Sequence, residues 1–186
     1  NGVSPNITID ALYAFTDCEV SISPNACIII EDKPHFVGIK QILKYSVDQT
    51  EDLLRQELEI RKSELLEKIL FSSLEKIFIE NRIYRDIEEC ETWEDVLNVI
   101  DSELEPFKAK FHRNINEEDL IRLTEIKIKR ISKFDAFRAN ALMTNLEKEL
   151  KQTLHDLAHL TEFTISYYKQ LLEKYGKGKE RKTEIA

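Results

Sequence analysis

Apolar residues recur at steps of three or four positions along the C-terminal part of the chain, between about Arg138 and Tyr175. These steps return each side chain to the same face of an α-helix. The stripe consists of Leu142, Leu146, Leu150, Thr153, Leu157, Leu160, Thr164, Tyr167 and Leu171. A helix over this range would be roughly 55 Å long at the usual rise per residue. One apolar stripe of that length requires a partner of similar length to cover it.

A second periodic segment, from about Gly38 to Tyr84, offers this partner. About fifty residues separate the two segments, which is enough for a small helical cap. The pattern predicts a mainly α fold, in which a long antiparallel two-helix coiled coil carries a small helical tip. An ordinary four-helix bundle has the same periodicity and is the alternative. The second stripe consists of Leu54, Leu58, Leu65 and Ile69, with Arg61 at an intervening position where an apolar residue would be expected.

The residue pattern of the N-terminal segment predicts a short helix followed by a β-hairpin. Val20 and Ile22 alternate with polar residues as in a strand, and the next apolar run is β-branched. A two-stranded hairpin is marginally stable by itself, so we expect further strands outside this chain. The elements are expected at Ile7–Ala14 (the helix, entered after Pro5), Cys27–Ile30 and His35–Val37 (the strands), and Glu31–Pro34 (the turn).

Two helix-start signals lie between the long segments. Thr92 and Asn116 each precede an apolar run and are followed three positions later by an acidic residue, as in a capping box. The first of these helices should end at Pro106, and the second should continue to Ile131. The stretch Ser132-Lys133-Phe134-Asp135 then indicates a stop and a restart into the C-terminal helix, which ends at Gly176. We expect bending where helix signals weaken, at residues 46–50 and 132–134.

Composition narrows the function. The net charge is −8, so the chain is not a general nucleic-acid coat protein. The apolar runs are too short to span a bilayer and no secretion signal is visible, so we expect a cytoplasmic location. Cys18, Cys27 and Cys90 have no CxxC spacing and are expected to be reduced. The chain starts at Asn1 without a methionine, and we expect it to be part of a larger protein.

No catalytic site and no metal site are predicted. His155 and His159 have the spacing of a helical zinc pair, but Asp156 replaces the glutamate of the metalloprotease motif and a third ligand is missing. The most compact basic cluster could contact DNA phosphates weakly. In an acidic chain, a solvated helix end is the favoured interpretation of that cluster. The cluster consists of Lys127, Lys129, Arg130 and Lys133.

Three stretches resemble a known family in the order that the family shows. Residues 11–21 (ALYAFTDCEVS) resemble its "LFATTDLExS" segment, residues 120–135 (LIRLTEIKIKRISKFD) resemble its "AILDLKLxxLxxLE" element, and residues 180–185 (ERKTEI) resemble its "RRTEI". The family comprises the A subunits of bacterial type IIA DNA topoisomerases, in both topoisomerase IV and gyrase. The resemblance covers essentially the whole chain.

The resemblance implies that this chain is a non-catalytic part of an ATP-dependent isomerase. The whole enzyme would change DNA topology by double-strand passage. The nucleophilic tyrosine of the family lies in an upstream winged-helix domain, and the other subunit carries the metal-binding carboxylates. ATP and Mg²⁺ would therefore be used elsewhere in the complex, and this segment would need no cofactor. A DNA-wrapping domain that would follow Ala186 largely distinguishes gyrase from topoisomerase IV.

The resemblance also implies a domain organisation. The tower domain would end with residues 1–45, the outgoing coiled-coil helix would occupy 46–83 and the exit-gate dimerisation domain 84–135. The return helix would occupy 136–176, and a tail over 177–186 would lead back to the tower.

The implied partners are a second copy that meets this one at the tip, the B subunit of a heterotetramer and DNA in transit, without a membrane. Several of the residues proposed for the tip contact are expected to pack inside one protomer instead. The alternative function is an autonomous helical-hairpin module for protein interaction, such as a chaperone arm. The dimer-gate candidates are Leu123, Ile126, Ile128, Ile131 and Phe134.

Overall fold

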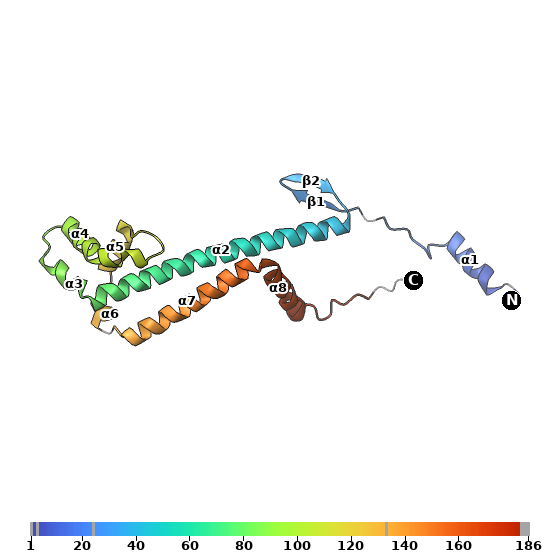
Figure 1. The fold of residues 1–186 in the computed structure, drawn as a ribbon. Coiled ribbons are helices and arrows are strands. Elements are labelled where there is room, and N and C mark those ends of the chain that lie inside the picture. The colour runs from blue at the N-terminus through green and yellow to red at the C-terminus, as the bar shows by residue number, and fades with distance from the viewer. Residues whose placement is uncertain (1, 3, 24, 133, 183–186) are drawn as a thin grey trace. The chain divides into compact units, whose positions relative to one another are not determined.

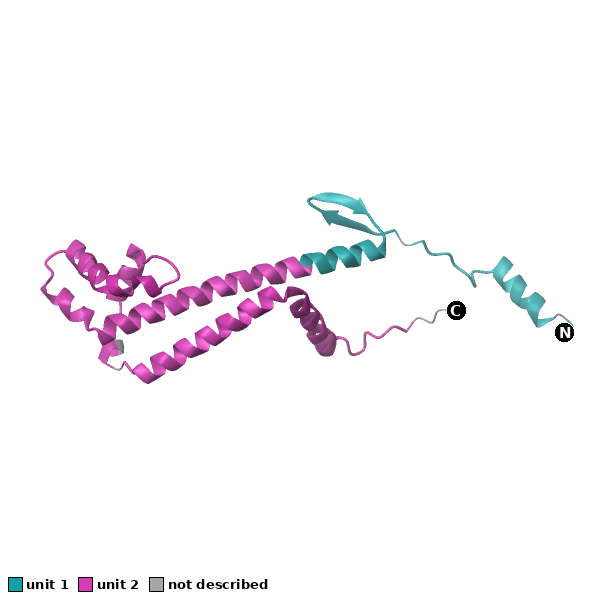
Figure 2. Ribbon diagram, in the orientation of Figure 1, with its two compact units in different colours: residues 1–49 teal, residues 50–186 magenta. Residues whose placement is uncertain are grey.

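The computed structural model describes residues 2, 4–23, 25–132 and 134–182, with the backbone alone at position 130. Two compact units divide the chain at residues 49 and 50 (Figure 2). The first unit contains a short helix and a hairpin, and the second contains the long helices and the tip (Figure 1). The expected mainly α fold with a short β-hairpin is confirmed.

The hairpin of the first unit follows helix α1 (Pro5–Phe15) and pairs β1 (Cys27–Ile30) with β2 (Lys33–Phe36) in antiparallel register. The turn is shorter than predicted, because Lys33 and Pro34 already belong to β2. Its two central residues, Glu31 and Asp32, have positive φ angles of 49° and 61°. This conformation matches the twist of the flanking strands in two-residue hairpins. The strand predicted around Val20 and Ile22 is wrong, since the described residues 19–23 have no regular structure.

Helix α2 (Ile39–Glu80) is continuous over 42 residues, or about 63 Å. The helix therefore has no break at residues 46–50, and the bend expected there stays a prediction, because the two compact units meet within this range. Polar residues such as Asp48 lower helix propensity by only about 0.7 kcal/mol each, which a long packed helix tolerates. The helix ends where Arg82 takes a left-handed conformation with φ of 60°.

The helical tip, residues 83–132, is made of short elements. Thr92 and Asn116 cap α4 and α5 as predicted, and Asn116 forms a full capping box with Asp119. Pro106 lies in the 3₁₀ turn that follows α4. The elements are α3 (Ile83–Asp86), η1 (Ile87–Glu89), α4 (Trp93–Leu104), η2 (Glu105–Lys110), α5 (Glu117–Thr124) and α6 (Ile128–Ser132).

The second tip helix was expected to run unbroken to Ile131, and this prediction is wrong. The helix stops at Thr124 and resumes as α6 at Ile128. In an unbroken helix, the core face that carries Leu120 and Leu123 would continue through Lys127. The break keeps Lys127 exposed, while Ile126 and Ile131 pack against the core.

The return side of the arm is also divided. Asp135 accepts hydrogen bonds from the backbone N–H groups of Phe137 and Arg138 and so starts α7 (Ala136–Ala158). The single helix predicted to Tyr175 is interrupted at His159, after which α8 (Leu160–Tyr175) begins. His159 has φ of −122° and ψ of 45°, and its ring Nδ1 donates to the carbonyl oxygen of His155 at 2.9 Å. This side-chain contact accompanies the departure from helical geometry.

Helices α2 and α7 are antiparallel, and α8 turns away from the direction of α7 (Figure 1). Cross-helix hydrogen bonds join Glu51 to Thr161, Arg61 to Glu149 and Lys76 to Asn140, so partner numbers fall as α2 advances. The predicted stripes are buried in part: Leu54, Leu58 and Leu65 are buried on α2, and Thr153 and Thr164 are buried on α7 and α8. Two members of the C-terminal stripe, Leu142 and Tyr167, are exposed instead. Each threonine hydroxyl donates to a carbonyl oxygen of its own helix, which makes its burial tolerable.

Candidate functional site

The helical tip has its own apolar core, which joins the end of α2 to α3, α4 and α5. Burial of this core, at roughly 25 cal/mol per Å² of apolar area, is what holds these short helices together. The core therefore gives the tip a fixed shape at the end of the arm. Its buried residues are Leu70, Leu74, Phe78, Ile79, Ile83, Ile100, Leu104, Leu120 and Leu123.

Arg113 links the tip to the arm through two carboxylates. Its Nε and Nη2 donate to the two carboxylate oxygens of Glu67 on α2 at 2.8 and 2.7 Å. Its Nη1 and Nη2 donate to Asp119 on α5 at 2.6 and 3.0 Å, and Asp119 is only 3% exposed. Bidentate pairs of this kind are among the strongest polar contacts in proteins. We call these three residues the Arg113 clamp.

The clamp shifts the ionisation of all its members. The hydrogen bond from Arg113 holds the pKa of the Glu67 carboxyl below its usual range. Burial raises the pKa of Asp119, but hydrogen bonds from Arg113 and from the Asn116 N–H outweigh it and leave this pKa lowered. The pKa of Arg113 is raised by the two carboxylates. All three groups are therefore charged near neutral pH.

The tip should lose stability as the pH falls through the lowered pKa values of Glu67 and Asp119. Above the pKa that each carboxyl has in the unfolded chain, the clamp contributes in full, and this contribution disappears as the folded carboxyls protonate. Urea unfolding followed by the fluorescence of Trp93, the sole tryptophan, would measure the loss between pH 7 and about pH 3. Arg113→Met should flatten the profile in this window, and an equally steep profile would contradict the assignment.

The five dimer-gate candidates do not share one environment. Leu123 is fully buried in the tip core, and Ile126, Ile131 and Phe134 pack against that core. Ile128, in contrast, is 82% exposed. Among these five side chains, it is the one available to a partner without rearrangement of the tip.

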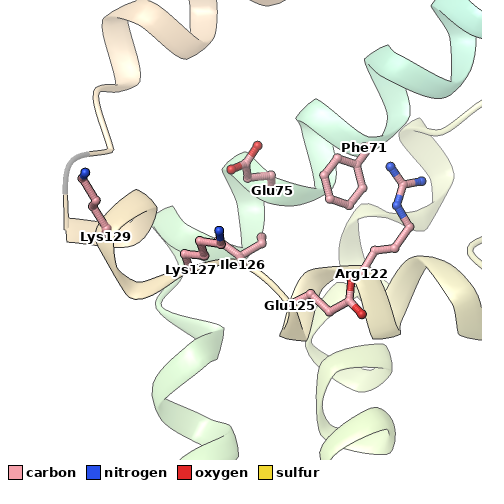
Figure 3. Close-up of a pocket in the computed structure, with 7 residues that line it drawn as sticks. All are labelled: Phe71, Glu75, Arg122, Glu125, Ile126, Lys127 and Lys129. Atoms are coloured by element: carbon pink, nitrogen blue, oxygen red, sulfur yellow. The ribbon is translucent and has the colours of Figure 1, made fainter.

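A groove of about 640 Å³ lies between α2, the end of α5 and the start of α6 (Figure 3). Phe71 and Ile126 supply its apolar part. The guanidinium of Arg122 stacks on the Phe71 ring, 4.1 Å from the ring centre, as Figure 3 shows. The remaining lining residues are charged: Glu75, Glu125, Lys127 and Lys129. A second groove of similar volume lies on the arm side of Phe71 and Arg122, toward Leu142 and Leu146.

Two of the four residues of the predicted basic cluster lie at this groove. Lys127 and Lys129 are exposed at its rim. Lys133 and the side chain of Arg130 lie outside the described residues. Arg122 joins Lys127 and Lys129 at the groove, although sequence patterns did not single it out.

The two candidate zinc histidines lie at the break between α7 and α8. Their rings stack with centres 4.3 Å apart, and the His155 Nδ1 lies 3.6 Å from a carboxylate oxygen of Asp156. Across the described residues, no group of three or more histidine, cysteine or acidic side chains could hold a metal ion. No described helix is both long and apolar enough to cross a membrane.

Comparison with known proteins identifies the family. The family model for the A subunits of DNA gyrase and topoisomerase IV matches residues 1–171. The chain belongs to this family. It is similar to the A subunit of DNA topoisomerase 4 from Borreliella burgdorferi, with 36% identity over 185 residues that cover 100% of this chain. It is also similar to the A subunit of DNA gyrase from Lawsonia intracellularis, with 28% identity over 174 residues and 92% of this chain.

The topoisomerase resemblance found from three short motifs is thus confirmed over nearly the whole sequence. The chain spans 30% of the length of the Borreliella protein and 18% of the length of the Lawsonia protein. The matched region includes the arm helices, the tip and the groove.

Proposed function

We propose that this chain forms the exit gate and its lever arms in the A subunit of a type IIA DNA topoisomerase. The whole enzyme would change DNA topology by ATP-dependent passage of one duplex through another. ATP, Mg²⁺ and the nucleophilic tyrosine would act in other domains or in the B subunit. This segment would release the transported duplex between two separable tips, with B subunits and DNA as the further partners.

The observation that carries this proposal is an antiparallel helix pair with a separately cored tip, in a chain of the topoisomerase A-subunit family. A gate needs a lever that keeps its shape and a contact surface that can separate. Helix α2 supports the first requirement by running 42 residues without a break. The exposed Ile128 supports the second. The net charge of −8 disfavours retention of DNA near the arms.

Ile128→Glu should weaken association of two chains at least tenfold, or by about 1.4 kcal/mol or more. The substitution places a charge where the proposed contact buries an apolar side chain, and the 82% exposure of Ile128 means that folding should be unaffected. Sedimentation equilibrium over a wide concentration range measures the dimer dissociation constant. Circular dichroism confirms the helix content of each variant.

Ile60→Glu is the matched control, because Ile60 is 62% exposed on α2 and lies outside the tip. It should leave the dissociation constant unchanged. A wild-type chain that remains monomeric at every accessible concentration would count heavily against the gate. That result would favour the alternative, an autonomous helical-hairpin module whose tip binds an unrelated protein.

A further inference from the structure

The groove beside Phe71 has a basic rim in a chain that is acidic overall. Arg122, Lys127 and Lys129 contribute positive charge, and within the described residues neither lysine has an ion-pair partner. Two carboxylates, Glu75 and Glu125, also line the groove, and Glu75 is buried. Apolar surface beside two unpaired lysines is complementary to an acidic segment that carries a large apolar side chain.

The same tip displays such a segment. Residues 86–95 include six acidic side chains and no basic one, and we call this stretch the acidic segment. Its aromatic residue, Trp93, is 54% exposed at the first position of α4. Among the described residues, Glu91 and Glu94 have no ion-pair partner. Tryptophan is enriched at the centres of protein interfaces, where it fills apolar pockets.

We propose that two copies of the chain meet by mutual docking, with the groove of each tip receiving the acidic segment of the other. A two-fold axis permits this arrangement, because each surface patch is then used twice. Figure 1 shows α3, α4, α5 and α6 gathered at the same end of α2. Ile128, between Lys127 and Lys129 in sequence, would be covered when the groove rim closes on its partner. This inference rests on the proposed function, since it names the partner of the gate surface.

A second copy fits the groove better than DNA does. Phosphates would also be attracted to Lys127 and Lys129, but the acidic segment lies on the same tip and would repel a duplex. The whole chain, at −8, adds to this repulsion. An ionic contact between copies further predicts that association weakens as salt is raised, because exposed charges are screened.

The test is a charge exchange between two variants. Lys127→Glu/Lys129→Glu makes the groove rim acidic, and Glu91→Lys/Glu94→Lys makes the segment basic. Each variant alone would bring like charges together twice and should associate at least about tenfold more weakly than wild type. A one-to-one mixture of the two restores complementarity at both contacts. Its dissociation constant should therefore return to within about threefold of wild type, or about 0.65 kcal/mol.

Sedimentation velocity on the wild type, on both variants and on their mixture measures these constants. Trp93→Ala should also weaken association, and Lys148→Glu/Lys151→Glu on α7 controls for net charge. Circular dichroism verifies folding.

Variants that each dimerise as well as wild type, or a mixture without recovery, would overturn mutual docking while the gate proposal stands. Loss of duplex DNA binding in the groove variant with unchanged dimerisation would also overturn it. A monomeric wild type would instead remove the gate proposal itself.

Discussion

Arg113→Met should lower the free energy of unfolding of the helical tip by about 3 kcal/mol, at the lower end of the range for breaking buried ion pairs. The substitution keeps the length of the side chain but leaves the Asp119 carboxylate, 3% exposed, without its cation. Glu67 is partly exposed and regains water, which moderates the loss. Urea unfolding at neutral pH, monitored by Trp93 fluorescence, reports on the tip directly.

Arg61→Met is the matched control for this prediction. Arg61 also pairs across elements, with Glu149, but both side chains are more than half exposed. Such surface pairs contribute only about 0–1 kcal/mol. Equal losses in the two variants would show that the Arg113 clamp is no stronger than a surface contact.

Leu123→Ala should weaken the folding of the tip, whereas Ile128→Ala should weaken the association of two chains. Leu123 is fully buried in the tip core, so its truncation should cost about 2–5 kcal/mol of tip stability. Ile128 is mostly exposed, and its truncation should change the stability of the monomer by less than about 0.5 kcal/mol. The dissociation constant of the dimer should rise with Ile128→Ala.

Both variants are best compared over a series of protein concentrations, because association itself stabilises the folded state. The concentration-independent part of the unfolding free energy isolates the core contribution. A loss of monomer stability in Ile128→Ala as large as that in Leu123→Ala would contradict the separation of core from contact residue.

Local signals in the sequence were sufficient for much of the fold. The caps at Thr92, Asn116 and Asp135 act within three residues, so they can be recognised without knowledge of the tertiary structure. The two breaks at residues 125–127 and at His159 were missed for a physical reason. Apolar periodicity continues through both, and only the packing of Ile126 or the ring contact of His159 shows where the helix departs.

The contacts of the candidate site were harder to predict from the sequence than the helices were. Glu67 and Arg113 are 46 residues apart, and no local pattern joins them. Asp119 was expected to accept only the Asn116 N–H as a capping residue, yet it also accepts from Arg113. Leu123 and Ile128 are both apolar residues of the helix predicted after Asn116, and both were gate candidates. The structure separates them, since Leu123 is fully buried on α5 and Ile128 is 82% exposed at the start of α6.

The weak packing of the first unit should affect the shape of the unfolding transition of this chain. Helix α1 has no buried residue, and at 11 residues it is shorter than the roughly 12–15 at which isolated helices become even marginal in water. The hairpin β1–β2 pairs through four residues a side, and an isolated two-stranded hairpin is marginal as well. These elements should therefore melt gradually, outside the cooperative transition. The denaturant dependence of that transition reflects the surface exposed by the arm and tip alone, and it should be smaller than a 186-residue globular domain would give.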